Sequence, residues 1–167
     1  MRPELRCVNL HPSRRLDTGW LERMARAALP LCLAAAGGGD KVLAGLDEVE
    51  INLVDDEAIR RVHRDFMGLD GATDVITFHH GEVVISLDTA ARQAVEHSCP
   101  FDREVFLYVV HGLLHLNGHT DHDDAGRAAM DALQQRIVGE VWSARNAERT
   151  RDQGAATRGR KKASRND

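Results

Sequence analysis

Four of the nine histidines of this chain fall within twelve residues, at positions 111, 115, 119 and 122. On a helix, His111 and His115 would be about one turn apart and project from the same face, close enough to bind one metal ion. The alternative is that both are core residues hydrogen-bonded to the backbone, because valine and leucine surround them. The residues that follow favour the metal site.

Gly118 comes three residues after His115 and is typical of a helix end, so the chain can turn back towards the same ion. Asp121 or His122 would then supply a third ligand, and both alternatives stay open. Three protein ligands leave a fourth position for water, which distinguishes a catalytic zinc site from a closed structural one. Zinc lowers the pKa of bound water to about 7, so the pattern predicts hydrolysis.

The residue after the first histidine disfavours one class of hydrolase. Zinc peptidases with this helix spacing carry a glutamate there as general base, whereas this chain has Gly112. A zinc peptidase is therefore the least favoured of the metal-dependent functions.

The rest of the chain must hold these histidines in place, and its hydrophobic pattern predicts a small sheet with helices. Two β-rich runs, 74–78 and 82–87, have a connection short enough for an antiparallel hairpin. Pro30 should end or kink the first helix, and Asp88 should cap the third. These features predict an α+β (mixed α/β) fold, a small mixed β-sheet packed with helices, with the metal site on a long helix and the loop after it. The other expected strands are residues 5–10 and 49–53, and the expected helices begin near residues 17, 55, 88, 101 and 123.

Length and charge predict one globular domain followed by a basic tail. The chain has 167 residues and a formal net charge of −4, which offers none of the basic excess expected of a nucleic-acid binder. Residues 145–167, however, hold eight Lys or Arg and three Asp or Glu, so this end carries +5 and residues 1–144 carry −9. We expect residues 1–148 to form the domain and residues 149–167 to be disordered.

The sequence predicts neither a membrane protein nor a secreted one. The longest apolar run, residues 27–36, is ten residues long and contains Pro30, far below the roughly 20 residues that cross a bilayer. The N-terminus lacks the apolar core and cleavage site of a signal peptide, and three widely spaced cysteines match no disulfide framework. We therefore expect a cytoplasmic protein with reduced thiols.

Three blocks of sequence, in a fixed order along the chain, have counterparts in one known family. Residues 109–118 read VVHGLLHLNG and are similar to its histidine signature. Residues 50–78 resemble its segment that ends in a Thr-Asp-Val strand, and GEVVIS at residues 81–86 resembles its next strand. Over about residues 46–138, the chain thus resembles the YbeY endoribonucleases, also called rRNA maturation factors.

This resemblance implies a zinc-dependent endoribonuclease specific for single-stranded RNA, acting in 3′-end maturation of 16S rRNA and in ribosome quality control. It implies one zinc ion per chain, with rRNA, the small ribosomal subunit and its proteins as partners, and no DNA. The family's third ligand, usually histidine, lies ten residues after the first, where this chain has Asp121. His122 takes its place if the loop holds one more residue, so both stay candidates beside His111 and His115. His119 is expected to be a loop residue that at most supports a ligand.

Two positions depart from the family pattern. Met67 stands where the family has an arginine implicated in its RNA chemistry, and a thioether cannot bind phosphate. Arg64 lies one helical turn earlier and is the candidate replacement, so it joins the two metal-binding histidines as a catalytic candidate. His79 and His80 stand where relatives tend to have proline, and they could line the cleft without binding the metal.

The missing arginine also supports a function of a different class. A ribosome-assembly factor would bind rRNA or ribosomal proteins without cutting, and its metal would be structural. In either case the basic tail, residues 149–167, is a candidate electrostatic tether to RNA, because flexible cations neutralise phosphates without a fold.

Overall fold

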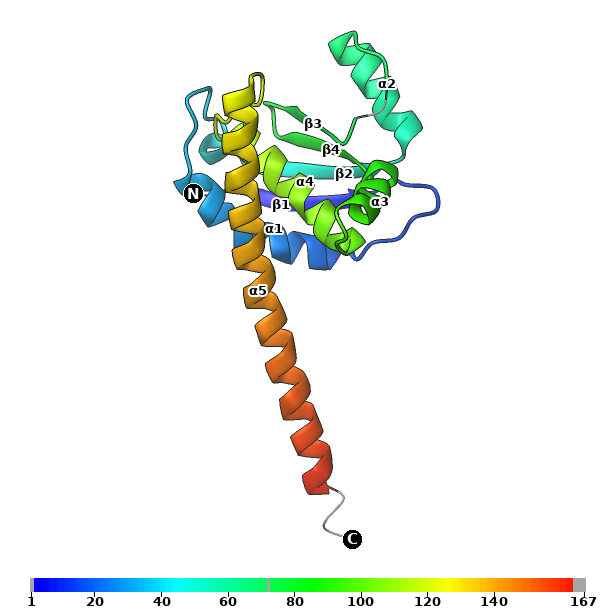
Figure 1. Ribbon diagram of the computed structural model, residues 1–167, viewed down its shortest axis with the longest axis vertical. Helices are drawn as coiled ribbons and strands as arrows, with labels where there is room; N and C mark the ends of the chain where they lie inside the picture. Colours follow the sequence, from blue (N-terminus) through cyan, green and yellow to red (C-terminus); the bar gives the residue numbers. More distant parts are fainter. Residues whose placement is uncertain (1, 72, 164–167) are drawn as a thin grey trace.

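A four-stranded mixed sheet lies at the centre of the computed structural model, which describes residues 2–71 and 73–163 (Figure 1). The strands are β1 (Glu4–Asn9), β2 (Glu48–Val54), β3 (Val75–Phe78) and β4 (Glu82–Ser86). Their order in the sheet is β1-β2-β4-β3. The first three in this order run parallel, and β3 pairs antiparallel with β4 at one edge. The α+β fold with a small mixed sheet is confirmed, and so is the predicted hairpin.

Helices cover both faces of the sheet (Figure 1). They are α1 (Thr18–Ala34), α2 (Asp56–Met67), α3 (Leu87–Glu96), α4 (Phe101–Leu116) and α5 (Asp124–Ala163). Side chains of α1 and α4 pack on one face, and α5 packs across these two helices. The other face is covered by α2.

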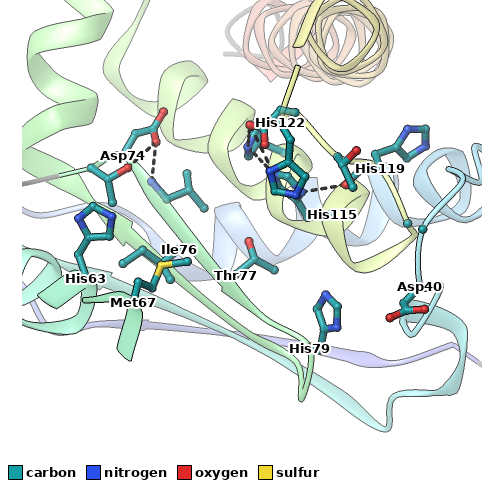
Figure 2. A pocket seen from close by; sticks show the side chains of 17 residues that line it. Asp40, His63, Met67, Asp74, Ile76, Thr77, His79, His115, His119 and His122 are labelled. Carbon is teal, nitrogen blue, oxygen red and sulfur yellow. Dashed lines mark hydrogen bonds and ion pairs between the residues drawn. The ribbon is translucent and has the colours of Figure 1, made fainter. Parts of the chain in front are cut away.

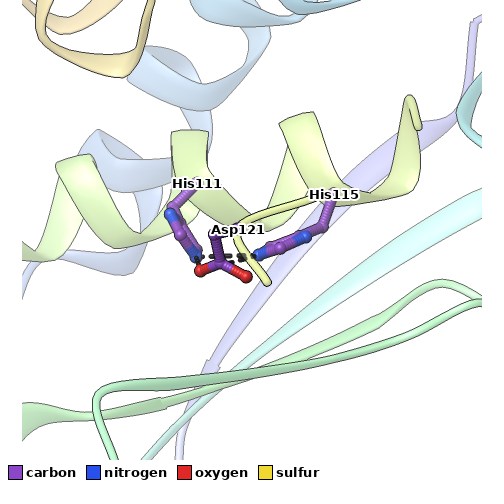
Figure 3. A group of neighbouring side chains, drawn as sticks. All are labelled: His111, His115 and Asp121. Atoms are coloured by element: carbon purple, nitrogen blue, oxygen red, sulfur yellow. Dashed lines mark hydrogen bonds and ion pairs between the residues drawn. The ribbon is translucent and has the colours of Figure 1, made fainter. Parts of the chain in front are cut away.

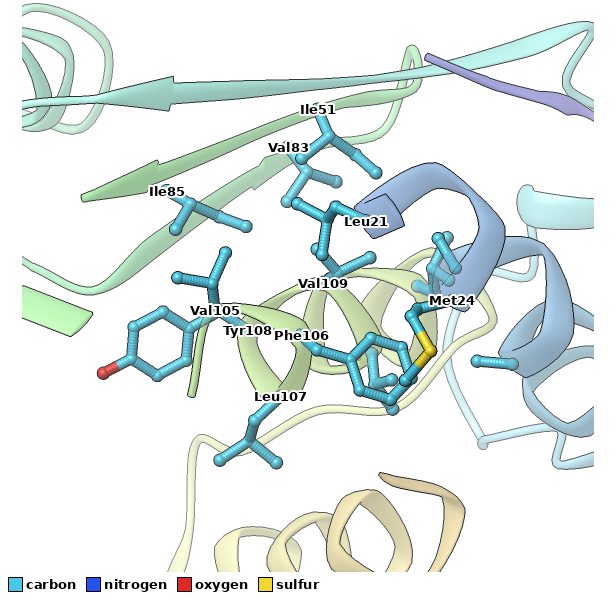
Figure 4. Close-up of a cluster of buried hydrophobic side chains, with 14 of the residues drawn as sticks. Leu21, Met24, Ile51, Val83, Ile85, Val105, Phe106, Leu107, Tyr108 and Val109 are labelled. Atoms are coloured by element: carbon cyan, nitrogen blue, oxygen red, sulfur yellow. The ribbon is translucent and has the colours of Figure 1, made fainter. Parts of the chain in front are cut away.

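The larger core fills the space between the sheet, α1 and α4 (Figure 4). Eleven of the sixteen residues of α4 are buried, because its sequence is largely apolar. Each fully buried large apolar side chain contributes roughly 1.5–3 kcal/mol, so α4 is firmly anchored. The side chains that meet in this core include Leu21, Met24, Ile51, Val83, Ile85, Val105, Phe106 and Val109.

The smaller core lies under α2 and holds the buried side chains of Val54, Ile59, Ile76 and Val84. The helix begins after Asp55, whose carboxylate accepts a hydrogen bond from the backbone N–H of Ala58 (2.8 Å). It ends at Gly68, which adopts a left-handed conformation (φ 65°) that glycine takes without strain. The helix begins where the sequence predicts, but little apolar surface holds it.

A polar junction joins the start of α2 to α3. The prediction that Asp88 caps α3 is wrong, because Ser86 occupies the cap position and accepts a hydrogen bond from the N–H of Thr89. The Asp88 carboxylate instead accepts hydrogen bonds from His11 Nε2 (2.8 Å), Arg14 Nε (2.8 Å) and the backbone N–H of Asp56 (3.0 Å). Burial alone would raise the pKa of Asp88, but these donors outweigh it and lower the pKa to about 2.

Two helices extend further than the sequence suggests. Pro30 does not end α1, which continues to Ala34. Helix α5 continues past residue 149, where the disordered tail was expected to begin, and reaches Ala163, so the backbone of residues 149–163 is helical rather than disordered. This stretch lacks proline and is rich in alanine, arginine and lysine, which favour helix. The division into a domain (1–148) and a tail (149–167) stays a prediction, and residues 164–167 lie outside the described residues.

Neither α5 nor any other helix in the described part of the chain is long and apolar enough to cross a membrane.

Candidate metal centre

Helix α4 carries both histidines of the predicted metal site, His111 and His115. They lie on the half-buried side of the helix, which is not part of either core. Between them, Gly112 lies directly against the sheet. A Cβ atom built on this glycine would come within 2.7 Å of Val83 Cγ1. The absence of a side chain therefore lets α4 approach β4 closely, and the glutamate of the zinc peptidases has no room here. The site does not favour peptide hydrolysis.

His111, His115 and Asp121 bring their ligand atoms together at the end of α4 (Figure 3). The Nε2 atoms of the two histidines are 2.9 Å apart, and Oδ2 of Asp121 lies 3.7 Å from each of them. In a tetrahedral site with zinc–nitrogen bonds of about 2.0–2.1 Å, two ligand nitrogens lie about 3.3 Å apart. The three atoms thus have a spacing that fits one metal ion.

Hydrogen bonds orient both imidazole rings. The Nδ1–H of His111 donates to Oε1 of Gln134 (2.8 Å), and the Nδ1–H of His115 donates to the carbonyl oxygen of His119 (2.9 Å). A neutral imidazole has one N–H, so each Nε2 carries a lone pair. Two lone pairs at 2.9 Å repel each other unless a cation lies between them. The donor set therefore fits a metal ion, and the bonded Nδ1 atoms are the usual support for metal-binding histidines.

The protonation state of His115 suits the same role. Burial lowers the pKa of His115, and the neighbouring ring of His111 lowers it further, while Asp121 acts in the opposite direction. The ring is consequently neutral at neutral pH, which is the form that binds metals.

The turn that delivers Asp121 is tied to the end of α1. Gly118 has a φ of +89°, in the left-handed region that favours glycine. The side chain of Asn117 is buried, and its amide donates hydrogen bonds of 2.9–3.3 Å to the carbonyl oxygens of Cys32, Leu33 and Ala35. These oxygens lie where a helix end leaves carbonyls without helical partners. Asn117 thus fixes the turn against a segment more than eighty residues earlier in the chain.

An open cleft of about 600 Å³ lies beside the metal group (Figure 2). Helix α4 and residues 117–122 form one side, which we call the α4 wall. The end of α2, residues 73–77 and His79 form the other, which we call the α2 wall. Among the described residues that line the cleft, none is a lysine or an arginine. Its titratable side chains are His63, His79, His111, His115, His119, His122, Asp40, Asp74 and Asp121.

Comparison with known proteins assigns the chain that carries this site to a family. The family described as Endoribonuclease YbeY matches residues 13–141. The chain belongs to the YbeY endoribonuclease family. Endoribonucleases are hydrolases that act on RNA, so this is the class of enzyme that the family contains.

Individual YbeY relatives agree with this assignment. The Endoribonuclease YbeY of Moorella thermoacetica is 38% identical over 141 residues, which cover 72% of this chain and 84% of that protein. That of Salinibacter ruber is 33% identical over 150 residues, covering 80% and 89%. That of Myxococcus xanthus is 45% identical over 109 residues, which are 56% of this chain but 36% of that longer relative.

A solved structure shows the same fold. The solution structure of TM1509 from Thermotoga maritima superimposes with a TM-score of 0.55 at 23% identity. The superposition covers 86% of this chain and 93% of the other. At this level of identity the likeness concerns the fold alone.

Some of the predicted site residues line the cleft, and others do not. His122 lines it but lies outside the three-residue metal group, so the geometry favours Asp121 as the third ligand. Met67 and His79 line the α2 wall. Arg64 does not line the cleft, and its exposed guanidinium lies 3.5 Å from the carboxylate of Asp65. Its role stays a prediction.

The remaining histidines have structural partners. His119 donates from Nε2 to the carbonyl oxygen of Ala35 (2.6 Å), and its own carbonyl accepts from His115, so it supports both the turn and a ligand. His80 lies outside the cleft, 3.2 Å from a carboxylate oxygen of Glu82.

Two residues of the YbeY site were missed by sequence reasoning. Gln134 is a polar residue on the buried stripe of α5, one turn after Met130 and one turn before Val138, and this unusual position was the signal that could have revealed it. Asn117 gave no such signal, because its partners at the end of α1 are distant in the sequence.

Proposed function

We propose that this chain is a zinc-dependent endoribonuclease that cuts single-stranded RNA and acts in 3′-end maturation of 16S rRNA and in ribosome quality control. It would work in the cytoplasm on rRNA, with the small ribosomal subunit and its proteins as partners. The observation that carries the proposal is the convergence of two imidazole nitrogens and one carboxylate oxygen beside an open cleft, in a chain of an endoribonuclease family. Two histidines and a carboxylate are a ligand set of catalytic zinc, which supports one zinc ion per chain.

The surrounding residues have separate roles in this proposal. His111, His115 and Asp121 would hold the ion, and Gln134 would keep the ring of His111 in its binding orientation. An ion held there supplies Lewis-acid polarisation of a phosphodiester and activation of water for hydrolysis. Arg64 is proposed to contact phosphate, because it lies one helical turn before Met67 in the α2 wall.

Metal analysis combined with RNA cleavage tests the proposal. Purified protein should contain about one zinc ion per chain and should cut labelled single-stranded RNA. His115→Ala should lose both properties, because it removes one of the three donor atoms. Full cleavage by a metal-free His115→Ala protein would falsify the proposal.

A matched pair of variants tests the third ligand. Asp121→Ala should lose bound metal, whereas His122→Ala should keep it, because only Asp121 places a ligand atom within reach of both histidines. Metal loss in His122→Ala together with retention in Asp121→Ala would assign the role to His122.

One observation favours a second candidate function. The described lining of the cleft lacks lysine and arginine, and Met67 stands in the α2 wall where the family resemblance places an arginine. A ribosome-assembly factor that binds rRNA around a structural metal would need no such group. RNA binding without cleavage at any metal loading would support this second function and contradict the first.

The basic end of the chain is proposed to tether RNA. Residues 145–167 carry a formal charge of +5. Deletion of residues 149–167 should weaken RNA binding and flatten its dependence on salt, because fewer counterions are then released from the RNA. Unchanged binding at low salt would contradict this role.

A further inference from the structure

Three aromatic side chains form a row beside the cleft, which we call the aromatic row. The ring centroids of Phe66 and Phe78 are 5.6 Å apart with an interplanar angle of 77°. Those of Phe78 and His80 are 5.5 Å apart with an angle of 22°. The row therefore leads from the last turn of α2 across the edge strand β3 to the turn before β4. Phe78 packs on the smaller core, whereas Phe66 is 72% exposed.

The aromatic row is continuous with the cleft. Met67 follows Phe66 directly and lines the cleft, as do Thr77 and His79 (Figure 2). Phe78 lies between Thr77 and His79 in the chain but does not line the cleft, and neither does Phe66 or His80, so the row lies beside the cleft and not inside it. A polymer chain that leaves the cleft over Met67 would therefore meet the exposed ring of Phe66 next.

The basic side chains of α2 lie on the other side of Met67 from Phe66, because residues two apart in a helix point in nearly opposite directions. Arg60, Arg64 and Met67 follow the i, i+4, i+7 spacing and share one helix face. Both arginines are exposed, and the guanidinium of Arg64 is paired only at 3.5 Å with the exposed carboxylate of Asp65. Aromatic side chains on one side of Met67 and cations on the other suit a polymer that has both flat bases and a charged backbone, which an apolar protein surface does not offer.

We propose that the aromatic row stacks unpaired bases of single-stranded RNA next to the cut site, while Arg60 and Arg64 contact the phosphates of the same segment. This inference rests on the proposed endoribonuclease function, because it takes the cleft to be the place of cutting. Bases in a duplex are already stacked on one another, whereas bases of a single strand are free to stack on aromatic rings. The aromatic row thus gives a physical reason for a preference for single strands.

The test is the affinity of the full-length, metal-loaded protein for a short unstructured oligoribonucleotide, measured by fluorescence anisotropy, with a gel to confirm that the RNA is intact. Phe66→Ala should raise the Kd about 5- to 150-fold, since one stacked base contributes about 1–3 kcal/mol. Phe66→Tyr keeps the ring and should bind within about twofold of wild type. Phe66→Leu keeps an apolar side chain without a ring and should lose nearly as much as Phe66→Ala.

Two controls separate stacking from other effects. Val95 on α3 is an apolar side chain with 80% exposure outside the row, so Val95→Ala should bind as wild type does. Phe66→Ala should not change the affinity for the same sequence annealed into a duplex. Circular dichroism should show the same helix content in all variants, because Phe66 contributes little buried surface.

The outcomes are distinct. Wild-type affinity in both Phe66→Ala and Phe66→Leu overturns the inference, and so does an equal loss for single strands and duplex. Self-association of the wild type that disappears in Phe66→Ala, with RNA affinity unchanged, would assign the surface to a second copy of this chain and also overturns it. The Phe66 effects do not require cleavage, so a protein that shows them but never cuts RNA would contradict the proposed function while supporting the aromatic row.

Discussion

The two walls of the cleft are built in opposite ways. The α4 wall stands on the larger core, and most residues of its helix are buried. The α2 wall stands on the smaller core and leaves Phe66, Met67 and Leu69 exposed. A deep core suits metal ligands, whose atoms must stay within a few tenths of an ångström of their positions. Exposed side chains suit a surface that meets a substrate. Under the proposed function, this fold separates the holding of the metal from contact with RNA.

A phenylalanine-to-alanine substitution on each wall should give the largest difference in the free energy of unfolding. Phe106→Ala should lower the free energy of unfolding by about 3–5 kcal/mol, because it leaves a cavity in the larger core. Phe66→Ala should cost at most about 1 kcal/mol, since its ring is mostly exposed and contacts Phe78 only edge to face. Urea denaturation measures both values. Similar losses of unfolding free energy in the two variants would contradict the difference between the two walls.

The contact between α4 and the sheet gives a second test. Gly112→Ala should lower the free energy of unfolding by up to about 3 kcal/mol, because the added methyl group overlaps the side chain of Val83. Gly139→Ala on α5 is the matched control. No described atom lies within 4 Å of a Cβ atom built there, so alanine should stabilise the helix by up to about 1 kcal/mol. Thermal melts distinguish the two, and a tolerated Gly112→Ala would show that the α4 wall is less tightly packed than its contacts indicate.

The support of a ligand by α5 can be tested without touching the ligand. Gln134→Ala removes the acceptor for the Nδ1–H of His111 and should weaken metal affinity about 10- to 100-fold. Its exposed neighbour offers a control, and Gln135→Ala should leave the affinity unchanged. Competition with a chromogenic chelator gives both constants. An unchanged affinity in Gln134→Ala would mean that packing alone orients the ring.

The attachment of the α2 wall should depend on pH. The pKa of Asp88 is about 2 in the folded protein against 3.8 for a free side chain, so its carboxylate stabilises the fold above about pH 4. That contribution, up to about 2 kcal/mol, should disappear as the pH falls from about 4 to 2. Asp88→Asn should therefore be less stable than wild type at pH 7, with the gap closing in acid. A gap that persists at pH 2 would mean that shape rather than charge holds this junction.

Sequence reasoning predicted the α4 wall better than the loop beside it. The histidine spacing and the apolar run identified the helix and two members of the candidate metal group, because both signals are local. The choice between Asp121 and His122 was not local, since the turn depends on Asn117 binding the end of α1. No pattern within the loop records that contact.

The other misses have similar causes. Ser86 and Asp88 are both suitable caps, and the choice depended on His11 and Arg14, which are more than seventy residues away and occupy the carboxylate of Asp88. Apolar periodicity ends near residue 147, but helix propensity continues beyond it, so α5 extends where no core requires it. Sequence pattern thus predicted which segments are buried. Long-range polar contacts decided which residue caps α3 and how the turn after α4 lies.

The position of β3 at the edge of the sheet has a consequence for handling the protein. An edge strand presents backbone donors and acceptors on which a second chain can add a strand, and short edge strands reduce this risk. Here the strand has four residues and borders the cleft. So short a strand offers few such groups, and strand addition at this edge should contribute little to aggregation of the protein during storage.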